Sequence, residues 1–485
     1  MAHEQAGVTA DLVCIDALGP QGEYRTRNRE VIMSTAGVPV AELSLVPPLY
    51  VSRTLAAQRK IKPLPVPARE AALDKAADVF ATAVIGGLDF DAYVELVSRI
   101  SGLPIGVTRA GAGVVADAVA TAFDAVRPAR PVGAVLDWRE ERTRTGGAVW
   151  ARRGEVFAVH AAGNGPGVHG LWPQALALGY RVAVRPSRRE PLTAHRLVNA
   201  LLCSGFRPED AVYLPTDHGG ADEIIRSADL AMVYGGQDVV DKYASDPTVM
   251  VNGPGRTKIL ITADRDWRDH IDLIVDSIAN LGGMACVNTT AVLYEGDPVP
   301  LAKAIAERLA AIEPLPSEDE RAILPTQPVD KAQALADYLA VKAAGTTPLL
   351  GADQVVAALG DGYAALRPAV HVLVAPGSGK LTDPLNIELP FPCVWVSPWS
   401  RDAGMEPLRN SLVVTAITGD DELIDDLLAE PTVTNVYSGN HPTYYSAPGI
   451  PHDGFLADGL MRNKGFIRDR DFPGRTVDAA PPEPT

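Results

Sequence analysis

Cysteine is scarce in this chain, and the four that it has, Cys14, Cys203, Cys286 and Cys393, lie far apart with no C-x-x-C spacing. This excludes a disulfide framework and a cysteine-based metal site, and it favours a reducing compartment. The first residues lack a basic stretch followed by an apolar one, and no uninterrupted apolar run reaches the roughly 18 residues of a membrane span. We therefore expect a cytoplasmic protein without a bound metal ion.

Positive charge is also in short supply. The 485 residues include 44 lysines and arginines against 60 aspartates and glutamates, which gives a net charge of −16. A field of that sign repels nucleic acids and anionic membrane surfaces, so neither is expected as a partner, and an anionic cofactor would need a local basic site. Single hydrophobic cores stop growing at about 250–300 residues, so this chain should fold as two or three structural units.

The hydrophobic pattern changes along the first third of the chain. Residues 31–51 alternate loosely between apolar and polar side chains, which favours surface strands, whereas residues 67–126 follow an alanine-rich helical pattern. Two short apolar runs, Val132–Trp138 and Ala148–Trp150, then flank a polar stretch with glycines. That arrangement predicts a β-hairpin that leaves the main body.

The middle of the chain alternates short helices with strands that are apolar throughout. The expected strands are Val156–His160, Arg181–Val184, Ala211–Leu214 and Ala231–Tyr234, and the expected helices are Leu171–Leu178, Leu192–Cys203 and Asp222–Arg226. Strands of this kind have both faces covered, so the order predicts a parallel, doubly wound α/β unit.

A second α/β unit is expected from Lys258–Ile261 onward. Apolar residues at helical spacing follow it and end at Gly282-Gly283, after which the chain passes Cys286 into the apolar run Thr289–Tyr294. Later strands are expected at Val370–Val374, Cys393–Val396 and Leu412–Ala416. The proline-rich tail, residues 479–485, is expected to be disordered.

One glycine-rich turn matches a dinucleotide fingerprint in form. Gly165-Pro-Gly-Val-His-Gly170 has the spacing G-x-G-x-x-G between a predicted strand and a predicted helix. However, Pro166 occupies the turn, and the next strand ends in Arg185-Pro-Ser-Arg-Arg189, where an acidic ribose ligand would be expected. Taken alone, the match is more typical of a packing turn.

Six segments in chain order resemble motifs of the aldehyde dehydrogenase superfamily, over about residues 155–395. They are Ala162-Gly-Asn-Gly-Pro166 (similar to P-W-N-x-P, with its first Pro and its Trp replaced), Val184-Arg-Pro-Ser-Arg188 (V-K-P-S-E), Pro191-Leu-Thr-Ala-His-Arg-Leu197, Val233-Tyr-Gly-Gly236 (F-T-G-S), Leu281-Gly-Gly-Met-Ala-Cys286 (Q-G-Q-x-C) and Glu388-Leu-Pro-Phe-Pro392 (E-x-F-G-P). Each motif is short, and their shared order carries the resemblance.

The resemblance implies an α/β, aldehyde dehydrogenase-like fold with two doubly wound α/β domains and a small β oligomerisation hairpin. The expected division is residues 1–130 (N-terminal segment and helical part of the nucleotide-binding domain), 131–153 (hairpin), 154–257 (nucleotide-binding domain), 258–434 (catalytic domain with Cys286) and 435–485 (C-terminal segment at the oligomer interface). The expected assembly is a homodimer or homotetramer.

The resemblance also assigns site residues. It makes Cys286 the covalent nucleophile and Asn164 a donor of the oxyanion hole. For the cofactor it implies Arg185, Ser187 and Arg188 at the adenosine ribose, Gly235 and Gly236 beside the pyrophosphate, and Glu388 at the nicotinamide ribose.

The chemistry of these residue types agrees with the roles of Cys286 and Asn164. A cysteine between a glycine pair and a strand lies on an exposed loop, where its thiolate can reach a carbonyl carbon. The tetrahedral oxyanion then needs fixed donors, which the Asn164 side chain and the Cys286 backbone N–H would supply. Cys203 and Cys393, in apolar patterns, are instead expected to be buried structural residues.

Two departures from the family pattern sharpen the expectation. Where hydrolytic members carry the water-activating Glu of E-L-G-G-K, this chain has Met250-Val-Asn-Gly-Pro-Gly255, so Val251 or Asn252 fills that place. Asn252-Gly-Pro-Gly-Arg256 is more similar to the acylating branch, which passes the acyl group to a thiol. Without a general base water attacks slowly, so a thioester product is favoured. The alternative is that another carboxylate, such as Glu388, serves as the base.

The second departure lies at the predicted adenosine ribose. Arg188 replaces the family's Glu, Arg185 replaces its Lys, and Arg189 is adjacent. Three guanidinium groups suit a 2′-phosphate, so NADP(H) is expected over NAD(H). The alternative is a solvated basic cluster at the end of a strand.

The histidines receive no catalytic role from the sequence. His160 and His169 flank the turn of Asn164 and are expected to be ordinary structural residues. His441 and His452 lie in the Tyr/Pro/Gly-rich segment Tyr437–Phe455, which could shape the mouth of a substrate site, but the pattern does not decide this.

The sequence thus predicts an NADP(H)-dependent acyl-thioester reductase, or acylating aldehyde dehydrogenase, that works through a covalent thioester on Cys286. Its expected partners are a small aldehyde or acyl thioester, carried on coenzyme A or on an acyl carrier protein. One alternative is NAD(P)+-dependent oxidation of an aldehyde to a carboxylic acid. A second is a non-catalytic scaffold that kept the fold.

Overall fold

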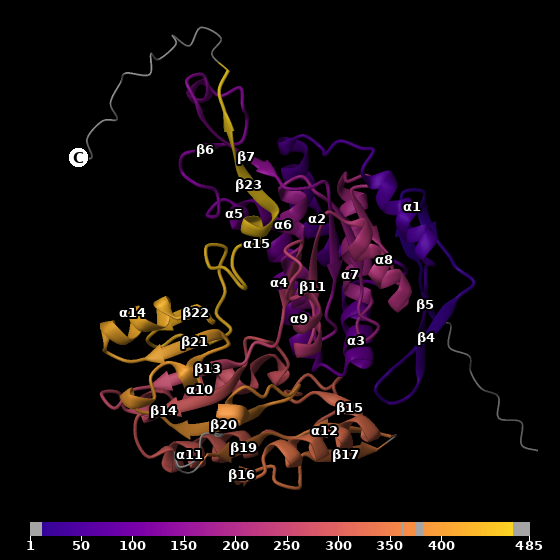
Figure 1. The fold of residues 1–485 in the computed structure, drawn as a ribbon. Coiled ribbons are helices and arrows are strands. Elements are labelled where there is room, and N and C mark those ends of the chain that lie inside the picture. Colours follow the sequence, from indigo (N-terminus) through magenta and orange to yellow (C-terminus); the bar gives the residue numbers. More distant parts are fainter. Residues whose placement is uncertain (1–11, 361, 374–381, 469–485) are drawn as a thin grey trace, which may run out of the picture.

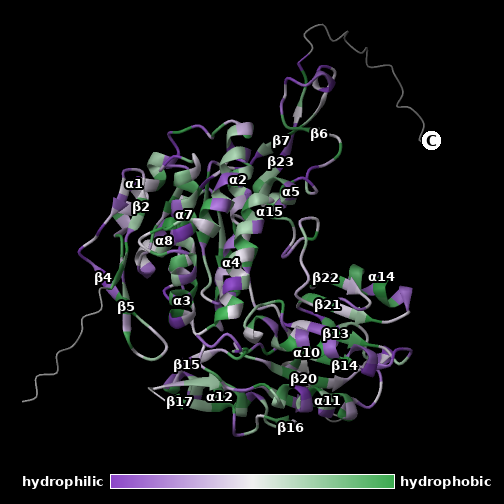
Figure 2. Ribbon diagram, turned by 180° about the vertical axis from the view of Figure 1, so that it is seen from behind, coloured by the Kyte–Doolittle hydropathy of each residue, from purple (hydrophilic) through white to green (hydrophobic). Residues whose placement is uncertain are grey.

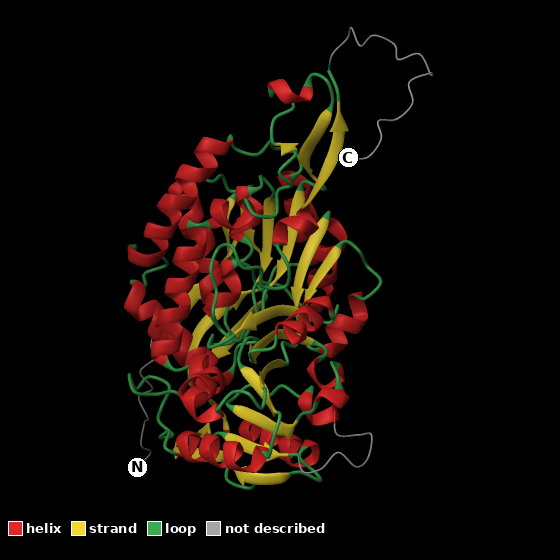
Figure 3. Cartoon of the chain, turned by 90° about the vertical axis from the view of Figure 1, so that its left-hand side faces the viewer, coloured by secondary structure: helices red, strands yellow, loops and turns green. Residues whose placement is uncertain are grey.

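The computed structural model describes residues 12–360, 362–373 and 382–468 (Figure 1). Two seven-stranded sheets organise the described chain, one in the upper and one in the lower half of Figure 1. Seen from the side in Figure 3, helices lie on both sides of the strands. The predicted tail, residues 479–485, falls outside the described residues, as does Val374 of the strand expected at Val370–Val374.

The upper sheet follows the predicted parallel unit and extends it. In spatial order its strands are β12 (Val249–Asn252), β11 (Leu230–Tyr234), β8 (Val156–His160), β9 (Arg181–Arg185), β10 (Ala211–Tyr213), β2 (Ala17–Gly19) and β3 (Gly22–Tyr24). The strands from β12 to β10 pair in parallel, and β2 and β3 join in antiparallel pairing. The four strands predicted in residues 156–234 are confirmed.

Both faces of the upper sheet are covered by helices. These are α1 (Pro48–Gln58), α2 (Val66–Thr82), α3 (Phe90–Ser101), α4 (Ile105–Ala120), α5 (Ala122–Val126), α6 (Pro173–Ala177), α7 (Leu192–Ser204), α8 (His218–Ser227) and α9 (Gln237–Tyr243). The helical pattern predicted for residues 67–126 is therefore confirmed. The predicted helix 171–178 is shorter than expected, since α6 begins at Pro173, which occupies its first turn, and ends at Ala177.

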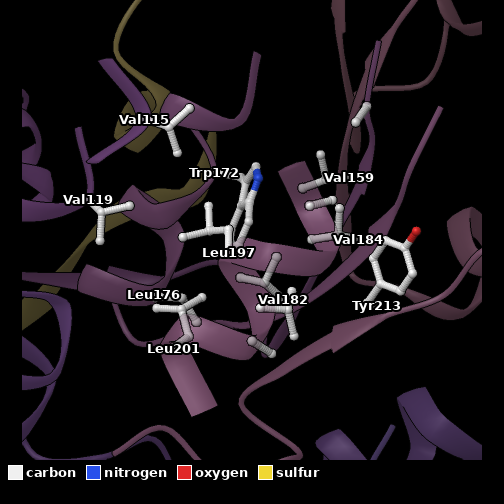
Figure 4. Packing of buried hydrophobic residues seen from close by; sticks show 14 of the residues in the cluster. Val115, Val119, Val159, Trp172, Leu176, Val182, Val184, Leu197, Leu201 and Tyr213 are labelled. Atoms are coloured by element: carbon white, nitrogen blue, oxygen red, sulfur yellow. The ribbon is translucent and has the colours of Figure 1, made fainter. Parts of the chain in front are cut away.

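Side chains that alternate along β8 explain why helices cover both faces. Phe157 and Val159 pack with residues of α2, α4 and α7, whereas Val156 and Ala158 pack with residues of α1 and α8. Figure 4 shows the first of these clusters, in which Trp172 and Leu197 lie against the strand residues. Burying each large apolar side chain stabilises the fold by about 1.5–3 kcal/mol.

The lower sheet is the predicted second α/β unit. In spatial order its strands are β16 (Thr347–Leu350), β19 (Ala369–Val372), β20 (Cys393–Pro398), β14 (Thr289–Tyr294), β13 (Thr257–Ile261), β21 (Ser411–Ile417) and β22 (Val433–Ser438). All pairs are parallel except that of β16 with β19. Its helices are α10 (Ile271–Ala279), α11 (Pro298–Ala310), α12 (Val329–Lys342), α13 (Thr382–Leu385) and α14 (Asp421–Ala429).

Three small sheets accompany the large ones in the described chain, and the third lies in the region of the predicted hairpin, described below. The first consists of β1 (Val13–Ile15), β5 (Pro39–Ser44) and β4 (Arg29–Met33), and the second of β15 (Thr326–Pro328), β18 (Tyr363–Leu366) and β17 (Val356–Gly360). The strands expected in residues 31–51 are thus only partly right. Pro48 begins α1, because a proline suits the first turn of a helix, where its missing N–H costs no hydrogen bond.

The predicted hairpin at residues 131–153 needs a correction. Its two strands exist as β6 (Ala134–Val135) and β7 (Gly147–Arg152), but they pair in parallel, so the intervening residues cross over instead of forming a tight turn. The antiparallel partner of β7 is β23 (Met461–Phe466), which follows α15 (Leu456–Leu460) near the end of the described chain. We call β6, β7 and β23 the arm; it projects from the upper half in Figure 1.

The helices of the described chain carry mixed polarity. In Figure 2 the ribbons of α2 and α4 show both hydrophilic and hydrophobic colours, as expected for helices with one face on a core. No single described helix is long and apolar enough to cross a membrane. Only α3 and α4 taken together meet the length and composition of a span, and they are bent by 119° at their junction.

Candidate active site

Cys286 lies on a loop whose backbone is tightly constrained. Before it, Leu281, Gly282 and Gly283 all have positive φ, at 55°, 69° and 65°. A Cβ on Gly283 would lie 2.4 Å from the backbone nitrogen of Pro392, so no larger residue fits there. After the turn, the Asn288 side chain accepts a hydrogen bond from the N–H of Ala285 at 2.9 Å. These contacts hold Cys286, which is half-buried, between α10 and β14.

The segment between β12 and β13 packs directly against the backbone of Cys286. A Cβ on Gly255 would lie 1.8 Å from the Cys286 carbonyl oxygen, and the Thr257 hydroxyl donates a hydrogen bond to that oxygen at 2.9 Å. Asn252 is buried at the end of β12. Residues 250–257 include no aspartate or glutamate, so this contact brings no carboxylate to the cysteine.

Asn164 lies beside the loop of Cys286, as the sequence predicts. Its Nδ2 donates a hydrogen bond to the carbonyl of Met284 at 3.2 Å. Among the described residues, its buried Oδ1 has no hydrogen-bond partner. The loop after β8 and the loop before β14 therefore place the Asn164 side chain against the backbone two residues before Cys286, although 122 positions separate Asn164 and Cys286 in the sequence.

His452 is the functional candidate that the sequence left undecided. Its Nε2 lies 3.5 Å from Cys286 Sγ, and its Nδ1 lies 2.6 Å from Asp453 Oδ2. Burial lowers the pKa of His452, but the charge of Cys286 and the hydrogen bond to Asp453 outweigh this effect and hold it well above its ordinary value. In the sequence, the adjacent Asp453 was the one indication of a role for His452, and it did not indicate that His452 lies near Cys286.

Glu388 lies in contact with the same inter-strand segment. Its Oε2 accepts hydrogen bonds from the N–H groups of Gly255 at 2.7 Å and Arg256 at 3.0 Å. Burial raises the pKa of Glu388, while the two N–H donors and the charge of Arg256 lower it in part. Arg256 has a φ of 47°, so Glu388 helps to hold a strained turn. Its other carboxylate oxygen can accept a hydrogen bond from a ribose hydroxyl.

Lys258, which follows this turn, holds it through hydrogen bonds. Lys258 is buried, and its Nζ donates to the carbonyls of Arg256 and Arg409 and to the Ser411 hydroxyl at 3.0, 3.1 and 2.7 Å. Burial, together with the charge of Arg256, lowers the pKa of Lys258 to about 7. Three hydrogen bonds explain how an amine is tolerated in this position.

The predicted adenosine site contains two arginines, Arg185 and Arg188, that differ in their partners. Arg185 ends β9, and among the described residues its buried Nε has no hydrogen-bond partner. Burial lowers the pKa of Arg185, and the nearby charge of Arg188 lowers it further. Arg188 is more exposed, and its Nε lies 3.1 Å from Glu30 Oε2. The Ser187 hydroxyl accepts a hydrogen bond from the N–H of Arg189 at 3.2 Å.

Two glycines near this site are closely packed against side chains of the same chain. A Cβ on Gly163 would lie 2.3 Å from the Ser187 hydroxyl, and one on Gly235 would lie 2.4 Å from the Val239 side chain. Gly236 is the last residue before α9. Within the described part of the chain, the observation that fits an anionic nucleotide is the Nε of Arg185, which has no hydrogen-bond partner.

The remaining cysteines and histidines give a mixed result. Cys393 is buried, as expected, but Cys203 is exposed because it lies beyond the buried stripe of α7. His160 and His169 are buried, and burial lowers the pKa of each to about 3. Within the described residues no group of three His, Cys, Asp or Glu side chains is placed to hold a metal ion.

The arrangement of the two large sheets and their covering helices matches a known architecture. An NAD-dependent aldehyde dehydrogenase from Sinorhizobium meliloti superposes with a TM-score of 0.80 at 16% identity, covering 96% of each chain. The chain has the aldehyde dehydrogenase fold. The aldehyde dehydrogenase KauB from Pseudomonas aeruginosa matches with a TM-score of 0.77 at 15% identity, covering 93% of this chain and 95% of that one. Aldehyde dehydrogenase 21 from Physcomitrella patens, solved with the reaction product succinate, matches with 0.77 at 16%, covering 96% and 100%.

At the level of sequence the chain is distant from known proteins. No protein-family model and no curated protein matches it. The structural likeness therefore supports the predicted fold class, whereas the chemistry of the site has to be argued from its own residues.

Proposed function

We propose that this protein is a nicotinamide-dependent oxidoreductase that interconverts an acyl thioester and an aldehyde through an acyl group on Cys286. The observation that carries the proposal is the contact between Cys286 and the segment that ends in Gly255 and Thr257. This segment packs against the backbone of Cys286, and it contains no carboxylate to activate water. A thiol then becomes the favoured acceptor for the acyl group.

In this reaction the chain supplies the nucleophile and the oxyanion donors. Cys286 Sγ attacks the carbonyl carbon, and the developing oxyanion accepts hydrogen bonds from Asn164 Nδ2 and from the Cys286 backbone N–H. Asn164 is already fixed by its bond to Met284, and its second amide hydrogen remains for this role. A bound nicotinamide would supply or accept the hydride. Glu388, fixed through Oε2, would orient its ribose.

For the cofactor we propose NADP(H) over NAD(H). Arg185 and Arg188, with Ser187 between them, would hold the 2′-phosphate, and Gly235 and Gly236 would let the backbone approach the pyrophosphate. The ion pair of Arg188 with Glu30 is half-exposed, and pairs of that kind contribute little, about 0–1 kcal/mol. A phosphate can therefore displace Glu30 at low cost.

The expected division of the chain and its assembly also remain proposals. We propose that residues 154–257 bind the nucleotide, that residues 258–434 carry the catalytic cysteine, and that the arm joins subunits into a dimer or tetramer. The arm suits this role because Val132, Leu136 and Trp138 are exposed on or beside its strands. Isolated apolar residues are common on surfaces, but three in one projecting element favour an interface.

Product analysis tests the proposed reaction. The purified protein is incubated with aldehyde and NADP+, with and without coenzyme A, and with acyl-coenzyme A and NADPH in the reverse direction. We expect acyl-coenzyme A as the product of the first reaction and aldehyde from the reverse one. Carboxylic acid formed at the same rate without a thiol would favour the hydrolytic alternative, with Glu388 as its base. Nucleotide binding without turnover in any of these mixtures would favour a non-catalytic scaffold.

A further inference from the structure

The segment between β22 and α15 carries a second set of reactive groups to the nucleophile. In Figure 1 this segment runs from the lower sheet up towards the arm. His452 contacts Cys286 Sγ through Nε2 and Asp453 through Nδ1, at 3.5 and 2.6 Å. The backbone of His452 is held as well, because Asn435 Nδ2 donates to its carbonyl at 2.6 Å and to the carbonyl of Leu412 at 3.0 Å. Thiol, imidazole and carboxylate thus follow one another in hydrogen-bonding order.

The charged and titratable groups around the imidazole favour its protonated form. Cys286 faces it from the loop before β14 and Asp453 from its own segment. Tyr234, at the end of β11, is half-buried, and burial, followed by the charges of Asp453 and Cys286, raises its pKa. Burial opposes the charge on His452, yet these negative neighbours leave the pKa of His452 raised. An imidazolium beside the sulfur favours the thiolate, which is the reactive form of the cysteine.

We propose that His452 is the catalytic proton carrier for acyl transfer to and from Cys286, that Asp453 positions it, and that the protein exchanges acyl groups between thiols without a nicotinamide nucleotide. This inference rests on the proposed thioester chemistry and extends it to a partial reaction. Cys286 lies on the loop before β14, and the proton comes from His452 in the segment between β22 and α15.

The exchange balances without an outside oxidant or reductant. The Cys286 thiolate attacks the thioester carbonyl, and the new C–Sγ bond forms as the carbonyl oxygen takes the negative charge. The bond to the carrier sulfur then breaks, and the leaving thiolate takes the proton from His452 Nε2. An incoming thiol returns a proton to Nε2, attacks the acyl group and releases the Cys286 thiolate. Each half of the cycle breaks one thioester bond and forms another, so a complete cycle replaces one thiol on the acyl group by another.

The test measures exchange with no nucleotide present. The full-length protein is mixed with acyl-coenzyme A thioesters of short, medium and long chain and with isotopically labelled free coenzyme A, and mass spectrometry follows the label into the thioester. We expect exchange by the wild type and none by Cys286→Ala. His452→Gln should slow exchange by ~10²–10⁴-fold, the usual contribution of general acid–base help. His441→Gln, at an exposed histidine in the same segment, is the matched control and should exchange at the wild-type rate.

Two further measurements separate proton transfer from a structural role. Added imidazole should restore exchange to His452→Ala, because a free base can occupy the space of the missing side chain. Alkylation of Cys286 by iodoacetamide at pH 7 should be slower in His452→Gln than in the wild type, since the imidazolium no longer stabilises the thiolate. Asp453→Asn removes a charge that raises the pKa of His452, so the high-pH limb of its exchange profile should move to lower pH.

The outcomes separate the role of His452 from the proposed thioester reaction. Wild-type exchange rates in His452→Gln would overturn the role of the histidine, as would a loss in His452→Ala that imidazole does not restore. A wild type that reduces acyl thioesters with NADPH but exchanges no label would overturn this inference and leave the proposed function intact. Thiol-independent oxidation of aldehyde to acid, without exchange, would instead remove the proposed function itself.

Discussion

Replacing Gly255 with alanine tests how closely the carboxylate-free segment fits against the nucleophile. The new Cβ would lie 1.8 Å from the Cys286 carbonyl oxygen and 2.9 Å from its Cα, whereas Cβ atoms essentially never come within 3.0 Å of another group. One of the two backbones must therefore move by more than 1 Å. Gly255 cannot move easily, because its N–H donates to Glu388 and its carbonyl accepts from the N–H of Leu412 at 2.7 Å.

The displacement should therefore fall on the loop of Cys286. A shift of about 1 Å in a reacting group costs roughly 10²-fold in rate, and overpacking costs about 1–3 kcal/mol of stability. The assay is the rate at which an acyl thioester acylates Cys286, followed by mass spectrometry, together with thermal denaturation and nucleotide binding. We expect slow acylation, moderate destabilisation and intact nucleotide binding in Gly255→Ala.

The matched control is Gly113→Ala in α4, where an added Cβ meets nothing within 4 Å. Alanine is the better helix former by about 0.5–1 kcal/mol, so this variant should acylate normally and be equally or more stable. Wild-type acylation in a folded Gly255→Ala protein would refute the argument that this segment fixes the position of Cys286.

The nucleophile, the oxyanion donor, a cofactor arginine and two buried histidines can each be tested by one measurement. Cys286→Ala should abolish turnover while nucleotide binding survives, and an acyl adduct on another cysteine in the wild type would refute this. Asn164→Ala should lower kcat by ~10²–10³ with a smaller change in KM, the usual cost of one oxyanion donor. Arg188→Glu should weaken NADPH binding by ~10–100-fold more than NADH binding, which corresponds to ~1.5–3 kcal/mol for a charge-assisted contact. Because burial lowers the pKa values of His160 and His169 from 6.5 to about 3, the free energy of unfolding should fall as pH drops below 6.5, where only the unfolded chain takes up those protons.

One control variant and three contrary results belong to these predictions. Arg127→Glu, at an exposed arginine paired with Asp124 at the end of α5, is the charge-reversal control for Arg188→Glu and should bind both nucleotides normally. Equal wild-type affinity for NADPH and NADH would refute the phosphate clamp. An unaltered kcat in Asn164→Ala, with chemistry rate-limiting, would remove Asn164 from the oxyanion hole. Equal stability by urea denaturation at pH 7 and pH 5 would contradict the burial of neutral histidines.

The parts of the fold that sequence patterns predicted are those with strong local signals. β8 coincides with the predicted Val156–His160, and α7 begins at the predicted Leu192, because wholly apolar strands and a helical stripe each have a characteristic period. Cys203 was expected to be buried but lies two positions beyond Leu201, the last buried residue of α7, since the pattern locates the buried face of a helix less sharply than the helix itself.

The pairings that the sequence could not supply join distant segments. β7 pairs with β23, more than three hundred residues later, and its parallel partner β6 precedes it by a crossover. His452 reaches Cys286 across 166 positions, and its adjacent Asp453, which His441 lacks, gives no indication of that contact. Glu388 was assigned to a ribose from the resemblance alone, and its bonds to Gly255 and Arg256 become apparent only in the folded chain.

The most direct test of the thioester chemistry is a single mixing experiment with aldehyde and NADP+. If residues 250–257 supply no base for water, and His452 assists a thiol and not water, the acyl group on Cys286 accumulates, and NADPH should appear in a burst of about one equivalent per subunit. Steady turnover should begin only when coenzyme A or another carrier thiol is added. Sustained conversion of aldehyde to carboxylic acid without a thiol, and with no burst, would contradict the account.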